Sequence, residues 1–377
     1  MFAQSLKWNK FGVTEGFAIG LMLASLAIAP QSFAQDSDVL SFESEAEAIQ
    51  ARMASYPQGD SVRNFEWFQP GETGHGADAP ELLADKADHA LLASNGLNEE
   101  MEFAAGADSN ALIVWHKGAI RYENYFSDYG MSDRTWSQSM HKSVVSILVG
   151  IAIDRGLIES VDDPASRYLL EWQGTDRDEV TIRQLLTMTS GLQLGGGSNI
   201  GMPFGLRVGL SNDIERAALD AALIAGPGRE FEYSNVNPQV LLAILERASG
   251  MRYTELLQEW LWAPIGAAPA QLWLDRPRGV ARAANSLAAT PRDWLRVGLL
   301  FLNDGQISGR QVVSKEWIDA TTTPSQLSGN YGFLTWLGSP ESGSRSFGTK
   351  NTFSVRHSAP FLSPDMVYFD GVGGQRV

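Results

Sequence analysis

The stretch Trp136-Ser137-Gln138-Ser139-Met140-His141-Lys142-Ser143-Val144-Val145-Ser146-Ile147-Leu148 contains the single Ser-x-x-Lys motif of this 377-residue chain. After the motif, apolar residues recur at spacings of three and four from Val144 to Ala152, which is typical of a buried helical face. Gly156 predicts the end of that helix. Side chains three residues apart lie on one helical face, with Cβ atoms about 5–6 Å apart. The Lys142 amine is therefore expected to reach the Ser139 hydroxyl.

A serine and a lysine in this arrangement suit a nucleophile and its base. Ser139 lies where the helix begins, and the partial positive charge of a helix N-terminus favours a developing oxyanion. Lys142 must lose its proton near neutral pH, which burial among apolar residues promotes by lowering the amine pKa. The spacing alone also fits a plain helix cap at Ser139 and a solvated charge at Lys142. Other residues in the sequence must therefore distinguish a catalytic pair from a simple cap and a surface charge.

A second polar pair occurs in Tyr233-Ser234-Asn235, just before the apolar helix expected from Pro238 to Ala248. A phenol near a lysine can pass a proton from the serine to a leaving group. An asparagine amide can orient Lys142 or bind a substrate carbonyl. Tyr122-Glu123-Asn124 has the same spacing, but it lies on an expected strand where packing is the commoner role of tyrosine.

A third feature is the glycine-rich run Gly371-Val372-Gly373-Gly374-Gln375. Acyl transfer needs a second oxyanion donor, and a glycine-rich strand edge lets the backbone approach a substrate closely. Gly373, Gly374 and Gln375 are the candidates for this role. The alternative is a simple turn after an expected strand from Met366 to Phe369.

The order of the expected elements predicts an α/β protein with an inserted helical lobe. Residues 35–105 indicate an irregular N-terminal segment, and a hairpin follows around Lys117-Gly118. Residues 106–160 and 285–377 are expected to form an α/β lobe, and residues 161–284 a mainly helical lobe. A helix is expected from Pro291 to Asn303.

Residues 106–377, with Ser139-Met-His-Lys142, Tyr233-Ser-Asn235 and the late Gly373-Gly374, resemble the serine β-lactamase and penicillin-binding superfamily. Among its members, this pattern is similar to the class C-like branch, 6-aminohexanoate-dimer hydrolases and related esterases. The resemblance implies an antiparallel sheet flanked by helices. It also implies Ser139 as nucleophile, Lys142 as base, Tyr233 as proton relay and Asn235 as a group that orients Lys142 and substrate. The amides of Ser139 and Gln375 would form the oxyanion hole.

Two departures from the superfamily pattern modify these expectations. Val372-Gly373-Gly374 replaces a Lys-Thr-Gly triplet, so no cation is expected there for a substrate carboxylate, and strong β-lactamase activity is not expected. The chain also ends at Val377, before the further strands and packing helix of the superfamily. The C-terminal strands and the helix of the superfamily are therefore expected to be missing from this chain. A strand near Gln375 would then lack a neighbour, and its open edge is expected to cause poor solubility.

The N-terminus predicts export to the periplasm or secretion. Lys7 and Lys10 precede an apolar run from Phe17 to Ala29, which is shorter than the roughly 20 residues of a membrane span, and residues 30–34 suit signal cleavage. Residues 1–34 are therefore expected to be a signal peptide that leaves no membrane anchor. The chain has no cysteine, so disulfides and thiolate chemistry are excluded.

The charge and the histidine content of the chain limit the kinds of binding partner and cofactor that it is expected to have. The formal net charge of −15 argues against nucleic acid and anionic membranes, which would repel the protein. The five histidines show no metal-ligand spacing, so neither a metal nor another cofactor is expected. A small ester or amide is the expected substrate, cleaved through an acyl-enzyme on Ser139. There are two alternatives. One is a peptidoglycan DD-peptidase of the penicillin-binding protein type, and the other is a non-catalytic binding protein of the same fold.

Overall fold

A computed structural model of the chain describes residues 44–57, 61–77, 81–85, 97–198, 200–338, 344–350, 354–356, 363 and 365–377. The predicted signal peptide at residues 1–34 lies outside these ranges. Within them, no helix combines the length and the hydrophobicity that a membrane span requires.

A four-stranded antiparallel sheet runs through the centre of the protein, with strand order β1-β5-β6-β4. Trp136 in β4 pairs with Ala288 in β6, which fixes the point from which the chain enters the Ser-x-x-Lys motif. The strands are β1 Gly71–Gly74, β4 Thr135–Trp136, β5 Ala270–Trp273 and β6 Leu287–Ala289.

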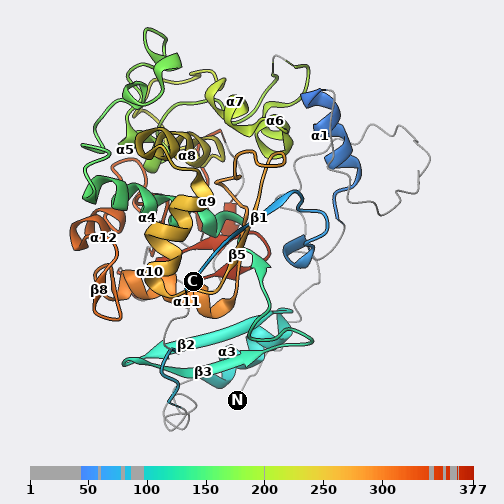
Figure 1. Ribbon diagram of the computed structural model, residues 1–377, viewed down its shortest axis with the longest axis vertical. Helices are drawn as coiled ribbons and strands as arrows, with labels where there is room; N and C mark the ends of the chain where they lie inside the picture. The colour runs from blue at the N-terminus through green and yellow to red at the C-terminus, as the bar shows by residue number, and fades with distance from the viewer. Residues whose placement is uncertain are drawn as a thin grey trace, which may run out of the picture.

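Short antiparallel pairs of strands surround this sheet. The hairpin of β2 and β3 lies at one end of the molecule (Figure 1) and turns at Lys117 and Gly118, which both have positive φ, as the predicted two-residue turn requires. The pairs are β2 Ala111–His116 with β3 Ala119–Tyr125, β7 Gln306–Ile307 with β8 Arg310–Gln311, β9 Trp336–Leu337 with β12 Val367–Tyr368, β10 Ser344–Ser346 with β11 Ser354–Arg356, and β13 Asp370–Gly371 with β14 Gln375–Arg376.

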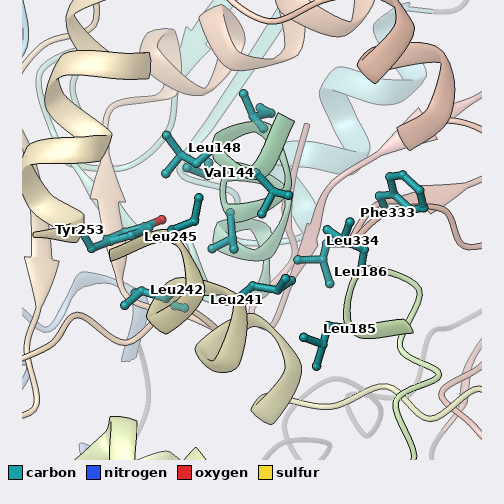
Figure 2. Close-up of a cluster of buried hydrophobic side chains, with 14 of the residues drawn as sticks. Val144, Leu148, Leu185, Leu186, Leu241, Leu242, Leu245, Tyr253, Phe333 and Leu334 are labelled. Carbon is teal, nitrogen blue, oxygen red and sulfur yellow. The ribbon is translucent and has the colours of Figure 1, made fainter. Parts of the chain in front are cut away.

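Helix α4 (His141–Asp154) forms the middle of the hydrophobic core. Every residue from His141 to Ala152 is buried, so the helix is covered on all sides. Figure 2 shows Val144 and Leu148 of α4 facing Leu241 and Leu245 of helix α8 (Val236–Ser249). Because the first turn of α4 also carries Lys142, the same packing that stabilises the core fixes the position of this lysine.

Several of the remaining helices begin at a capping serine or threonine. Helix α11 has Thr290 as N-cap, a reciprocal hydrogen bond with Asp293 and Pro291 in its first turn, close to the predicted range. The helices are α1 Glu45–Ala54, α3 Leu97–Gly106, α5 Ile182–Leu186, α6 Phe204–Leu210, α7 Ile214–Leu219, α9 Tyr253–Leu256, α10 Ala263–Ile265, α11 Pro291–Leu302 and α12 Lys315–Thr321; a π-helix spans Leu257–Trp262.

Three details of the predicted organisation are corrected by the structure. The N-terminal segment is not simply irregular, because it contributes α1 and the sheet strand β1, and β1 is held by backbone pairing with β5 rather than by strand-forming residues. Strand β5 falls inside the segment predicted to be mainly helical, so the central sheet draws one strand from that segment. The strand near Gln375 does have a neighbour, since Gln375 pairs with Gly371 across the β13–β14 turn.

Candidate active site

Ser139 and Lys142 meet at the start of α4. The Lys142 Nζ atom lies 2.9 Å from Ser139 Oγ, which is hydrogen-bonding distance. Ser139 is partly exposed, whereas the Lys142 side chain is 1% exposed. The serine is therefore partly open to solvent, while the amine beside it is enclosed by the core.

Burial controls the protonation of Lys142. Removing the ammonium from water disfavours its charged form and lowers the pKa of Lys142 from 10.5 to about 7. The amine also donates to the carbonyl oxygen of Ala284 at 3.0 Å. At neutral pH a large share of the lysine is then a neutral amine, whose lone pair can accept the proton of the Ser139 hydroxyl.

Tyr233 closes the site from the loop before α8. Its ring lies 4.9 Å from Lys142 Nζ, and its hydroxyl interacts with the Ser139 side chain. Burial raises the pKa of Tyr233 well above its usual value, and the interaction with Ser139 offsets only part of that rise. Tyr233 therefore remains a protonated phenol at neutral pH, which suits a proton relay better than a base.

Aromatic side chains hold the Tyr233 ring in place. Tyr233 stacks on Trp336 with ring centroids 5.4 Å apart, and it meets Phe347 edge-on at 5.1 Å. The Tyr233 amide also donates to the Phe347 carbonyl at 2.8 Å. Arg345 lies 4.3 Å from the Trp336 ring and forms a buried ion pair with Asp370. The ion pair between Arg345 and Asp370 thus lies beside the Trp336 ring that stacks on Tyr233 and helps to fix that ring.

Asn235 has a different place from the one expected for orienting the lysine. It occupies the N-cap position of α8 without a side-chain capping hydrogen bond, and it is partly exposed. Among the described residues, the second partner of Lys142 is the Ala284 carbonyl rather than Asn235. Because Asn235 is partly exposed and lies in the same loop as Tyr233, its amide can still contact a substrate. Tyr122, the competing tyrosine, is buried in β3.

The glycine-rich run forms a hairpin next to the Ser137–Ser139 segment. Gly373 and Gly374 lie in its turn with φ near +85° and +77°, as the simple-turn interpretation predicted, so they do not form the strand edge. The close approach is made by Gly371, where a Cβ would lie 2.3 Å from the Ser137 carbonyl oxygen. The Gln375 side chain accepts a hydrogen bond from Thr135 at 3.0 Å, which ties the hairpin to β4.

The backbone immediately before Ser139 turns sharply. Gln138 has φ of +49°, in the left-handed region that residues with a Cβ rarely adopt. Such conformations cost about 1–3 kcal/mol and persist where the surrounding structure enforces them. Here the close contact of Gly371 with Ser137 supplies that constraint, and the turn directs the chain from β4 into the first turn of α4.

Comparison with known proteins identifies the family. The Beta-lactamase family model matches residues 97–377, which is most of the chain. The chain belongs to the Beta-lactamase family. No cluster of three or more histidine, aspartate or glutamate side chains suited to a metal occurs in the part of the chain that the structure describes.

One curated relative resembles this chain over a little more than half of its length. The 6-aminohexanoate-dimer hydrolase of Paenarthrobacter ureafaciens is 29% identical over 223 residues, which are 56% of this chain and 56% of that protein. The chain thus spans little more than half the length of this curated relative.

Solved structures show the same fold. A Bacillus anthracis protein assigned as a 6-aminohexanoate-dimer hydrolase superposes with a TM-score of 0.64 at 18% identity, covering 84% of this chain and 83% of that one. A penicillin-binding protein homologue from Caulobacter crescentus gives 0.54 at 17% identity, covering 70% and 84%. The predicted fold class, a β-lactamase-like antiparallel sheet flanked by helices, is confirmed.

Several groups that surround Ser139, Lys142 and Tyr233 could not be predicted from the sequence. The Ala284 carbonyl is a backbone atom and leaves no mark in a sequence. Trp336, Phe347 and Arg345 lie about a hundred residues beyond Tyr233. An aromatic residue such as Trp336, when seen in the sequence alone, predicts packing and not a place beside Tyr233.

Proposed function

We propose that this protein is a serine hydrolase that cleaves small ester or amide substrates through an acyl-enzyme on Ser139. The observation that carries the proposal is the 2.9 Å contact between the hydroxyl of the partly exposed Ser139 and a buried Lys142 amine whose pKa is lowered to about 7. Membership of the Beta-lactamase family and the similarity to a 6-aminohexanoate-dimer hydrolase support the choice of reaction.

The reaction follows from the proton positions. Neutral Lys142 takes the Ser139 proton as Oγ forms a bond to the substrate carbonyl carbon, which gives a tetrahedral oxyanion. Backbone amides near Ser139 and Gln375 are the proposed oxyanion donors. As the bond to the leaving group breaks, Tyr233 passes a proton from Lys142 to that group. Water then attacks the acyl-enzyme by the same route and frees the acid.

The proposed substrates are linear amides of the 6-aminohexanoate type or simple carboxylic esters. Asn235 and the β13–β14 hairpin, with Gly373 and Gly374 in its turn, are the proposed substrate contacts. Export remains a proposal from residues 1–34, which cell fractionation with N-terminal sequencing of the mature protein would test. A cytoplasmic chain that retained these residues would contradict it.

Turnover of p-nitrophenyl esters, together with intact-mass detection of an adduct, tests the reaction. We expect a transient acyl adduct on Ser139 and loss of both adduct and turnover in Ser139→Ala. Undiminished turnover in that variant would refute the proposal. Labelling by fluorescent penicillin in place of ester turnover would indicate the DD-peptidase alternative. A stable adduct without hydrolysis would indicate the binding-protein alternative.

A further inference from the structure

His141 lies beside the proposed base and is completely buried, yet the reaction as described does not use it. Its Nε2 atom is 2.8 Å from the Tyr253 hydroxyl of α9, and its Nδ1 atom is 3.3 Å from the backbone nitrogen of Ser286. Both ring nitrogens are therefore satisfied by groups from distant segments.

The hydrogen-bond pattern fixes the protonation of this ring. Burial, with a smaller contribution from the positive charge of Lys142, lowers the pKa of His141 to about 3, although a hydrogen bond with the Arg282 backbone opposes part of this shift. The imidazole is therefore neutral at neutral pH. The Ser286 N–H must donate, so Nδ1 is the acceptor. The proton then lies on Nε2, which donates to Tyr253.

The segment that His141 contacts also carries the carbonyl that orients the base. Residues 281–286 have no continuous helix or strand, and Ala284 in their middle accepts the hydrogen bond from Lys142. At the other end of the segment, Gln239 of α8 donates to the Ala281 carbonyl at 3.0 Å and accepts from the Ala283 amide at 2.9 Å. Buried polar side chains from two core helices thus hold both sides of Ala284.

This arrangement has a consequence for the amine. A neutral lysine has two N–H donors and one lone pair. If one N–H is held by the Ala284 carbonyl, rotation about the last side-chain bond is restricted, and the lone pair can remain directed at Ser139 Oγ. The other titratable groups that face Lys142 are the Tyr233 phenol and the neutral His141 ring.

We propose that His141 is a positioning residue for Lys142: it holds Ser286 so that the Ala284 carbonyl orients the amine toward Ser139. Gln239 supplies the matching restraint on the other side of Ala284. The inference rests on the proposed acylation of Ser139, and it assigns a function to the second variable position of the Ser-x-x-Lys motif.

The test compares two substitutions at one position with a neighbouring control. His141→Leu removes both hydrogen bonds, whereas His141→Asn keeps a side-chain acceptor near the Ser286 amide. Ser143→Ala removes a different buried hydrogen bond from the same helical turn, to the Leu334 carbonyl. The measurements are thermal stability, the rate of adduct formation on Ser139 and the pH profile of kcat/KM with a p-nitrophenyl ester.

We expect His141→Leu to reduce the plateau of kcat/KM by about 10- to 100-fold, because a small misplacement of a catalytic group has effects of this size. Its acid limb should move to lower pH, because the ammonium loses a carbonyl acceptor that favours the charged form. His141→Asn should recover part of the rate. Ser143→Ala should lose stability and keep the wild-type profile.

The outcomes separate this inference from the proposed function. Absence of any adduct in the wild-type protein would refute the acyl-enzyme itself. A wild-type protein that acylates, together with a His141→Leu variant of unchanged rate and pH profile, would overturn the positioning role alone. Equal losses of rate in Ser143→Ala and His141→Leu would also overturn it, because they would indicate general destabilisation.

Discussion

Gly371 lies directly against the backbone of Ser137, where a Cβ would come within 2.3 Å of the carbonyl oxygen. No rotation of a side chain can relieve such a contact, because the clashing atom belongs to the backbone. The β13–β14 hairpin and the turn into the serine motif are therefore coupled through this one glycine.

Gly371→Ala should separate the hairpin from the nucleophile. We expect about a 100-fold loss in the rate of Ser139 acylation, since displacements near 1 Å have effects of this order. Stopped-flow acylation by a p-nitrophenyl ester would measure it. Gly209→Ala is the control, because a Cβ at that position of α6 meets nothing within 4 Å. A Gly371→Ala variant with wild-type acylation would contradict the coupling.

The pH dependence of the reaction should report Lys142. With a pKa of about 7, the fraction of neutral amine increases about tenfold between pH 6 and pH 8, and kcat/KM should increase in proportion. The high pKa of Tyr233 predicts no decline from phenol ionisation up to pH 9. A flat profile from pH 5 to pH 9 would show that Lys142 does not act as the base.

The folded protein should be stabilised by removing the buried amine. The pKa of Lys142 is lower in the folded state than its ordinary value of 10.5, so between pH 7 and 10.5 the unfolded chain binds more protons. The free energy of unfolding therefore rises with pH in this range. The destabilisation of the folded state by the buried Lys142 ammonium is fully present below pH 7.

Lys142→Met keeps the length of the side chain without its charge. After allowing for the hydrogen bond lost by Ala284, we expect a gain of about 1–3 kcal/mol in the free energy of unfolding at pH 6. The gain should shrink as the pH approaches 10. Urea unfolding at both pH values would measure it, and a difference that did not vary with pH would contradict the assigned pKa.

The Arg345–Asp370 ion pair should matter more than the pair that Asp370 forms with Arg376. Arg345 is 2% exposed and Arg376 is 57% exposed. Arg345→Gln leaves a poorly solvated carboxylate near Tyr233, and should cost about 3–5 kcal/mol of unfolding free energy and slow acyl transfer. Arg376→Gln should cost about 0–1 kcal/mol. Equal effects of the two substitutions would show that the buried Arg345–Asp370 pair contributes no more to stability or acyl transfer than the exposed Arg376–Asp370 pair.

Much of the fold follows from local patterns. The turn at Lys117-Gly118, the apolar spacing after Ser139, and the cap and proline at Thr290-Pro291 each predict an element that the structure contains. In these segments the hydrophobic periodicity and the turn residues agree with the final structure. Strand β1 was missed because its residues, Gly-Glu-Thr-Gly, gain their strand conformation from pairing with β5.

The sequence by itself determined the spacing of Ser139 and Lys142, since one helical turn brings these side chains to the same face. It also pointed to Tyr233 through its motif. The tertiary structure decided what surrounds them. Burial, which lowers the pKa of Lys142, arises from helices packed on every side of α4. Its hydrogen bond to Ala284 joins residues 142 positions apart, and a backbone carbonyl can be placed there only when the whole chain has folded.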